Sequence, residues 1–174
     1  MNNKYPYQTG YIYIPIVLDK AGMPQAIEID GDKLDIKTDF HVSLVCVKDM
    51  ITEHGEEIEQ RVLRFFYAFV EENEVSLEGF TGEYRLAERN TEGEYRKTIV
   101  GMCIVSNLDN FYSELNKHLG TNFDNQPTHV TLYTLDPNKG IGLNNQTSFI
   151  NMTRDITNTV IDMYPKIKSI SYKI

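Results

Sequence analysis

Two short segments of the chain repeat one order of residue types, and each contains a histidine. The first is Phe40-His41-Val42-Ser43-Leu44, and the second is Thr128-His129-Val130-Thr131-Leu132. In both, a hydroxyl residue follows the histidine by two positions, with an aliphatic residue on either side of the hydroxyl. By ordinary residue frequencies, a given histidine is followed by this pattern on the order of once in a few hundred cases. The chain has 4 histidines, so chance is a poor explanation for two occurrences.

The spacing within each segment suits phosphate chemistry if both segments are β-strands. Side chains at i and i+2 of a strand project from one face, about 6 to 7 Å apart. Two such strands close together would surround one tetrahedral group with two imidazoles and two hydroxyls. One imidazole can take a proton from an attacking oxygen, the other can protonate a leaving oxygen, and each hydroxyl can donate to a non-bridging phosphate oxygen. The motifs therefore favour cleavage of a phosphodiester.

A few further residues are candidates for contacts with a substrate. Tyr133 has the same strand phase as His129, so it could stack on a base or hydrogen-bond a phosphate, and Tyr11 and Tyr13 could do so from the opening strand. Ordinary aromatic packing explains these tyrosines equally well. We find no Arg or Lys in phase with either motif on its strand, which leaves Lys139, in a loop, as a candidate cation.

The elements that must position these residues are read from hydrophobic periodicity and from turn residues. The order is strands, helix, strands, helix, strand, a weaker third helix and a strand, with hairpin-like connections, which is typical of an α+β fold. The expected strands are Tyr11 to Ile14, Ala26 to Ile36 with a turn at Asp30-Gly31-Asp32, Phe40 to Val47, Val75 to Gly79, Glu83 to Glu88, Tyr95 to Val105, Thr128 to Leu135, and a closing strand with Ile170, Tyr172 and Ile174; the expected helices are Glu56 to Glu72, Asn107 to Leu119, and one after Thr147.

Length and composition indicate one domain spanning residues 1–174, because 174 residues with 41% hydrophobic content can bury one ordinary core. No apolar stretch is long enough for a membrane span, and the N-terminus lacks the pattern of a signal peptide. We therefore expect a cytoplasmic monomer with no membrane partner, and with Cys46 and Cys103 as free thiols. The net charge of -8 argues against binding of long duplex nucleic acid. A small substrate or a strand end fits better, and a local basic pocket on an acidic protein stays open.

The paired motifs resemble those of the 2H phosphoesterase superfamily, whose members carry two His-x-Thr/Ser-x motifs roughly 80 to 90 residues apart. The resemblance implies a pseudo-twofold, bilobal α+β domain in which two antiparallel sheets face a central cleft and helices cover the outside. It also implies that His41 and His129 are the catalytic acid–base pair and that Ser43 and Thr131 bind the phosphate. It leaves open which histidine is the base. Members include 2′,3′-cyclic phosphodiesterases, RNA ligase-like proteins, 2′,5′-oligoadenylate phosphodiesterases and phage enzymes that destroy cyclic-nucleotide signals.

We therefore expect a phosphodiesterase that hydrolyses a nucleotide phosphodiester, either a 2′,3′-cyclic phosphate or a small 2′-5′ linked, 3′-5′ linked or cyclic oligonucleotide. No cofactor is expected. A metal site is disfavoured, because the chain has no HExxH motif and no His/Cys pair at zinc-finger spacing. Two alternatives stay open: a nucleotide-binding module without turnover, and a ligase acting on cyclic-phosphate RNA ends.

Overall fold

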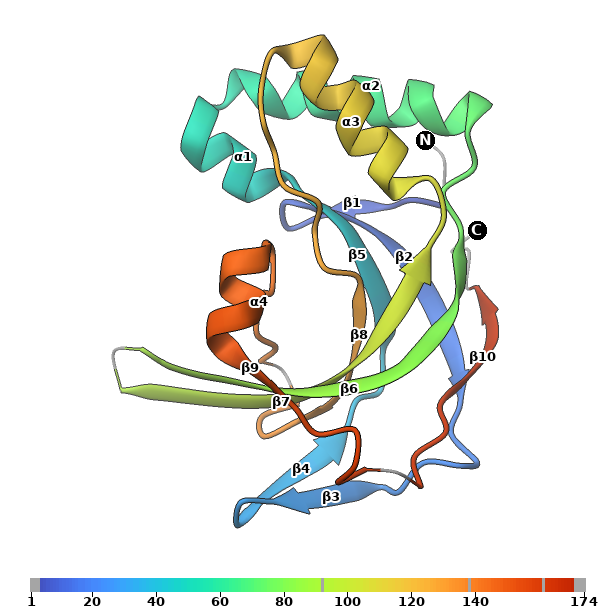
Figure 1. Ribbon diagram of the computed structural model, residues 1–174, viewed down its shortest axis with the longest axis vertical. Coiled ribbons are helices and arrows are strands. Elements are labelled where there is room, and N and C mark those ends of the chain that lie inside the picture. Colours follow the sequence, from blue (N-terminus) through green and yellow to red (C-terminus); the bar gives the residue numbers. More distant parts are fainter. Residues whose placement is uncertain (1–3, 92, 138, 161, 171–174) are drawn as a thin grey trace.

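The computed structural model describes residues 4–91, 93–137, 139–160 and 162–170, and it has the expected α+β class (Figure 1). All of its strand pairs are antiparallel. In chain order, the elements are β1 (Tyr7–Gln8), β2 (Tyr11–Asp19), β3 (Ala26–Ile29), β4 (Asp32–Ile36), β5 (Phe40–Cys46), α1 (Val47–His54), α2 (Glu57–Glu72), β6 (Leu77–Thr91), β7 (Glu94–Val105), α3 (Leu108–Leu119), β8 (His129–Thr134), α4 (Gln146–Met152), β9 (Thr153–Asp155) and β10 (Lys166–Ile170).

The described strands join in one sheet with the order β1-β2-β5-β8-β7-β6-β9. The remaining strands attach to it, with β10 on β2, β4 on β8 and β3 on β4. The two motif strands, β5 and β8, are neighbours in the middle of the sheet. They share one paired position, Val42 with Val130, whereas β8 pairs with β7 along most of its length. The middle of the sheet is therefore where the two halves of the chain meet.

Helices α1, α2 and α3 gather at one end of the molecule, and α4 lies apart from them beside the sheet (Figure 1). Both long helices were predicted from their apolar stripes, and both bury those stripes. Phe66 of α2 and Phe111 of α3 meet edge to face, with ring centroids 5.1 Å apart. The Tyr112 hydroxyl of α3 donates to the Leu44 carbonyl of β5 at 3.1 Å. These contacts attach the helical layer to the first motif strand.

Local sequence signals explain several boundaries. The β3–β4 turn has positive φ at Asp30 (54°) and Gly31 (82°), as tight hairpins with twisted strands require. Gly120, just after α3, has a φ of 69° and ends that helix as predicted. Helix α1 was not predicted, because its eight residues follow directly on a strand and are too few for a clear period.

Two of the expected strands, Val75 to Gly79 and Glu83 to Glu88, belong to one continuous strand. Strand β6 runs unbroken from Leu77 to Thr91, and register irregularities occur near Gly79 and between Phe80 and Tyr84. Glycine and turn signals in this region therefore mark bends of a continuing strand. The closing strand is present as β10, but Tyr172 and Ile174 lie outside the described residues.

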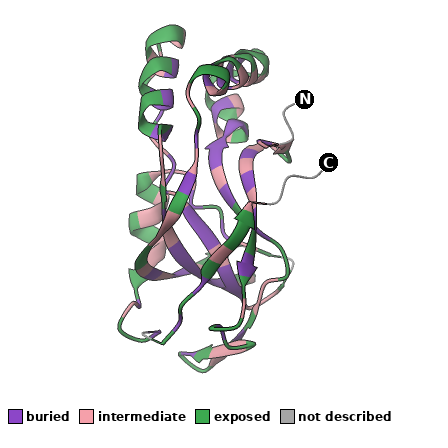
Figure 2. Cartoon of the chain, turned by 90° about the vertical axis from the view of Figure 1, so that its right-hand side faces the viewer, coloured by how far each residue is buried: buried purple, intermediate pink, exposed green. Residues whose placement is uncertain are grey.

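The core is concentrated in the central strands, while the outer faces of the helices are exposed (Figure 2). Val42, Leu44, Val130 and Leu132 are all fully buried. These residues alternate with the histidines and hydroxyls of the two motifs, so the apolar row of each motif anchors its strand. Among the described helices, none has the length and apolar character needed to cross a bilayer.

Candidate active site

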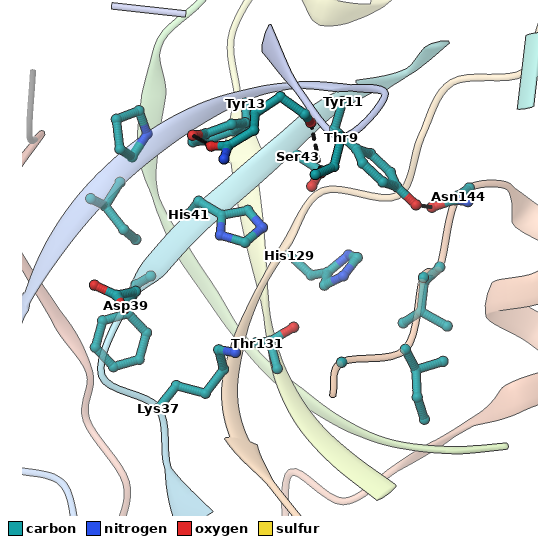
Figure 3. A pocket seen from close by; sticks show the side chains of 18 of the residues that line it. Thr9, Tyr11, Tyr13, Lys37, Asp39, His41, Ser43, His129, Thr131 and Asn144 are labelled. Atoms are coloured by element: carbon teal, nitrogen blue, oxygen red, sulfur yellow. Dashed lines mark hydrogen bonds between the residues drawn. The ribbon is translucent and has the colours of Figure 1, made fainter. Parts of the chain in front are cut away.

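One cleft of about 850 Å³ is lined by all four polar motif residues, His41, Ser43, His129 and Thr131 (Figure 3). The structure thus brings the two motifs, which are far apart in the chain, to one cleft. The other walls come from β2, from the connection between β4 and β5, from the start of α1, from the β6–β7 hairpin and from a loop after β8. The cleft lies on the face of β5 and β8 that is opposite their buried valines and leucines.

The register between β5 and β8 explains why the motifs meet. Val42 pairs with Val130 in an antiparallel ladder. If this register continued for one residue in each direction, Thr131 would lie opposite His41 and His129 opposite Ser43. Residues on either side of a paired position project from the other face of the sheet than the pair itself. The pair therefore puts the histidine and hydroxyl of both motifs on the same face, opposite Val42 and Val130.

The His129 ring is held by a contact with a backbone carbonyl. Its residue is 8% exposed, and Nδ1 lies 2.8 Å from the Pro127 carbonyl oxygen. A carbonyl can only accept a hydrogen bond, so Nδ1 carries the proton and Nε2 has a free lone pair in the neutral ring. Burial lowers the pKa of His129, and the bond to Pro127 opposes this only in part. His129 is therefore suited to accept a proton at Nε2.

His41 has a more open environment. Its ring centroid lies 5.2 Å from that of Tyr13. The pKa of His41 is lowered to about 4, first because the cleft walls displace water from the ring, and then because Lys37 and a protonated His129 repel a proton there. Asp39 acts in the opposite direction. The residue as a whole is exposed, so the ring keeps some hydration and an entering anion can reach it.

The two hydroxyls are available to a ligand. Ser43 and Thr131 are both half-buried on the cleft wall. Within the part of the chain that the structure describes, neither side chain makes a hydrogen bond. A half-buried hydroxyl gains from a partner, because a polar group that loses water without a hydrogen bond is destabilising. A phosphate oxygen in the cleft would supply that partner.

Two predicted substrate contacts lie elsewhere. Tyr133 is fully buried outside the cleft lining, and its hydroxyl donates to the Pro24 carbonyl at 2.9 Å. The β7–β8 register shifts between Thr131 and Tyr133, and this irregularity breaks the alternation on which the prediction depended. Lys139 is also outside the lining, and its amine pairs with Glu94 at 2.7 Å. The charge of Lys139 is thus already compensated.

The cleft contains basic residues that sequence reasoning missed. Lys37 lies in the short connection between β4 and β5, and both of these strands pair with β8, so the connection stays at the cleft wall. Figure 3 shows its side chain extending toward Thr131. Lys37 precedes His41 by four residues, so strand alternation would place both side chains on one face. Lys37 was missed because it lies before the expected strand. The basic lining residues are Lys20, Lys37, Lys48, Arg89 and Arg96, against the acidic Asp39 and Asp49.

The opening strand and the loop after β8 close the cleft on one side. The Tyr11 hydroxyl donates to Asn144 Oδ1 at 3.2 Å (Figure 3). Asn144 Nδ2 in turn donates to Asp49 at 2.8 Å. The amine of Lys48 lies 4.6 Å from the centroid of the Tyr11 ring. Tyr11 and Tyr13 both line the cleft, as their proposed contact with a substrate requires.

Other chemistries find less support among the described residues. The Cys46 and Cys103 thiols are buried, and burial raises their pKa values to about 11 and about 12, which disfavours the thiolate form of a nucleophile. The described residues contain no group of three His, Cys, Asp or Glu side chains placed to hold a metal ion. Comparisons of the chain with models of protein families, with curated proteins and with solved structures found no match.

Proposed function

We propose that this protein is a phosphodiesterase, which hydrolyses a phosphodiester of a nucleotide or short oligonucleotide by acid–base catalysis with His41 and His129 and without a metal. One observation carries the proposal: the two motifs face each other across the Val42–Val130 pair and line one cleft. Five basic and two acidic residues line that cleft in a chain of net charge -8. This local excess of positive charge favours an anionic ligand.

The same pair of motifs supports the finer fold proposal, a pseudo-twofold arrangement of two lobes. An antiparallel pair has a local twofold axis between its strands, and exchange of β5 and β8 about Val42–Val130 exchanges the two motifs. In this proposal, β1, β2, β5 and β10 form one lobe, while β8, β7, β6 and β9 form the other. The single paired position between β5 and β8 would be the seam.

The different environments of the histidines suggest a role for each. His129 is buried, neutral and free at Nε2, so we assign it as the base that removes a proton from the attacking water. His41 is exposed, so it can regain a proton from solvent, and we assign it as the acid that protonates the leaving ribose oxygen. The P–O bond to the water oxygen forms as the bond to the ribose oxygen breaks. Exchange of protons with solvent then restores both rings.

Phosphate binding is expected to prepare the acid. In the free protein, His41 has a pKa of about 4 and is neutral at pH 7. A bound phosphodiester brings a negative charge next to the ring, which favours the protonated form and raises the pKa. Ser43 and Thr131 would donate to the non-bridging oxygens, and Lys37 would add positive charge. Because protonation of free His41 requires acid, kcat/KM should be largest below neutral pH.

The test is an assay of the metal-free protein with 2′,3′-cyclic mononucleotides, cyclic-ended RNA, 2′-5′ oligoadenylate and cyclic di- and trinucleotides. His41→Ala and His129→Ala are the matched loss-of-function variants, and His54→Ala is the control, because His54 lies outside the cleft lining. We expect turnover of at least one substrate, which each cleft variant lowers by at least about 100-fold and which His54→Ala retains. A cleft variant that keeps wild-type turnover would refute the proposal.

The same assay distinguishes the two alternatives. A nucleotide-binding module would bind a probe in calorimetry without product appearing over hours. A ligase would join the cyclic end to an added strand with a 5′-hydroxyl, because that hydroxyl would attack the phosphorus in place of water while the same ribose oxygen leaves. Product analysis with and without that strand separates ligation from hydrolysis.

A further inference from the structure

Two arginines stand directly opposite each other on the β6–β7 hairpin. Arg89 of β6 pairs in register with Arg96 of β7, and both line the cleft. Figure 1 shows this hairpin as a long arm that reaches past the other strands. Like charges at directly opposed positions destabilise an antiparallel pair. An anion bound between them would relieve this repulsion.

The chain supplies only part of that compensation. Arg96 donates to Glu94 at 2.8 Å and to the Gly140 carbonyl at 3.0 Å, which leaves three of its five N–H donors without these partners. Arg89 is exposed. Within residues 4–91, 93–137, 139–160 and 162–170, the Arg89 side chain has no hydrogen bond or ion pair. Among the described residues, the guanidinium charge of Arg89 therefore has no carboxylate partner.

Lys97, the residue after Arg96, shows how the same hairpin neutralises a buried cation. Lys97, on the other face of β7, is 2% exposed, and its amine lies within 3.5 Å of carboxylates from Asp30, Asp32 and Glu88. Burial by itself would lower the pKa of Lys97, but the hydrogen bonds to Asp32 and Asp30 raise it overall. Carboxylates thus surround the cation on the core face, while the cleft face stays basic.

The arginine pair is separate from the histidine pair. Val100 of β7 pairs with Thr131, and Arg96 lies four residues away along the strand, which is about 13 Å at 3.3 Å per residue. The backbone positions of the arginine pair and of the histidine motifs are therefore well separated along the cleft. The volume of about 850 Å³ is near the upper end of the range of about 300 to 1,000 Å³ for ligand pockets. The cleft is therefore large enough for a ligand that reaches both positions.

We infer that Arg89 and Arg96 bind a second phosphate of the substrate. The substrate is then a short oligonucleotide, linear or cyclic, with at least two phosphates, rather than a cyclic mononucleotide. This inference rests on the proposed function for the phosphate that reacts, but it concerns another group of the same ligand. Arginine suits this task, because its planar fork can donate two parallel hydrogen bonds to a phosphate.

A binding experiment tests the second site without any catalysis. The probes are 5′-phosphorylated diadenylate, with two phosphates, and adenosine monophosphate, with one, titrated calorimetrically into the His41→Ala/His129→Ala protein. Loss of a charge-assisted pair of hydrogen bonds corresponds to about a tenfold change in affinity. We expect Arg89→Gln and Arg96→Gln each to weaken the two-phosphate probe about tenfold more than the one-phosphate probe. Arg64→Gln, an exposed position on α2, changes the charge equally and should alter neither affinity.

A turnover experiment with the wild-type background uses two substrates with the same reacting group: a dinucleotide with a 2′,3′-cyclic phosphate end, and a 2′,3′-cyclic mononucleotide. Arg89→Gln should lower the ratio of kcat/KM for the dinucleotide to kcat/KM for the mononucleotide about tenfold. Most of this change should be an increase in KM for the dinucleotide. If no substrate turns over, the proposed function fails, while the calorimetry still decides on the arginine site. Equal losses for both probes, or no loss, would overturn the second phosphate site.

Stability measurements separate this role from a structural one. Arg89→Gln removes a repulsion across the hairpin, so its Tm should equal or exceed that of the wild type. Added inorganic phosphate should raise the Tm of the wild type more than that of Arg89→Gln, because a ligand stabilises the folded protein that binds it. A fall of several degrees in the Tm of Arg89→Gln would show that Arg89 stabilises the fold, and would count against the site.

Discussion

The two motif strands have the same order of residue types but place their histidines in different environments. His129 on β8 is nearly buried, and a backbone carbonyl holds its Nδ1 at 2.8 Å. His41 on β5 is exposed, and it has Tyr13 and the positive charge of Lys37 beside it. The pKa values of both are lowered, but only for His41 does a neighbouring lysine contribute.

This difference shows that a repeated motif sets the types of the candidate acid–base groups, while their neighbours set the protonation of each. A fixed tautomer, as in His129, suits a group that must accept a proton at one nitrogen. Solvent access, as at His41, suits a group that must be reprotonated in each cycle. The comparison therefore makes distinct predictions for the two halves of the site.

The largest expected effect follows removal of either imidazole. His41→Ala and His129→Ala should each lower kcat by about 10²- to 10⁴-fold, the usual contribution of general acid–base catalysis. Because His129 is buried, His129→Ala should also lower the Tm, whereas His41→Ala should change it little. Steady-state kinetics and thermal unfolding of both variants check this. Equal Tm values for both variants would contradict the contrast between the two halves.

The hydroxyls should have smaller effects, of similar size in the two motifs. Ser43→Ala and Thr131→Ala each remove one donor to a charged oxygen, which corresponds to roughly 10- to 100-fold in kcat/KM. The conservative variants Ser43→Thr and Thr131→Ser keep the donor and should retain most activity. If the alanine variants match the wild type, the hydroxyls do not bind the phosphate.

Replacement of Lys37 should change the pH dependence of the His41 half. In Lys37→Gln, the positive charge that lowers the pKa of His41 is gone, so this pKa rises and the acidic optimum of kcat/KM moves toward neutral pH. Lys33→Gln is the matched control, because Lys33 is exposed and lies outside the cleft lining. A pH profile of Lys37→Gln identical to that of the wild type would show that Lys37 does not influence the pKa of His41.

The smallest expected effect is on stability. The folded pKa of His41, about 4, is below the usual value of 6.5, so the folded state binds fewer protons than the unfolded chain between these values. The free energy of unfolding should therefore decrease as the pH falls from about 6.5 to about 4. Chemical denaturation at several pH values measures this, and His41→Ala should show a weaker decrease. A stability that increases over this range would contradict the lowered pKa.

Much of the site was predictable because local patterns encode it. The alternation around His41 and His129 predicted two strands with polar rows on one face, and both strands are present as β5 and β8. The apolar stripes of α2 and α3 predicted those helices nearly to the residue. These signals depend on residues within one or two turns or along one strand, so no distant contact is needed to interpret them.

Other features depended on how the strands pair. Tyr133 was predicted to face the cleft, but an irregular step in the β7–β8 register leads to its burial. Lys139 was predicted to meet a phosphate, but it pairs with Glu94 across the chain. The opposition of Arg89 and Arg96 follows from one long hairpin, which the sequence suggested as shorter pieces.

The amino-acid sequence by itself determined the paired His and hydroxyl motifs, the face of the strand on which each side chain lies, and the two long helices. Only the tertiary structure decided that β5 and β8 are neighbours, that Lys37 lies beside His41, and that a basic cleft forms in an acidic chain. The physical reason is that periodicity is local, whereas strand register and electrostatic surroundings depend on residues far apart in the chain.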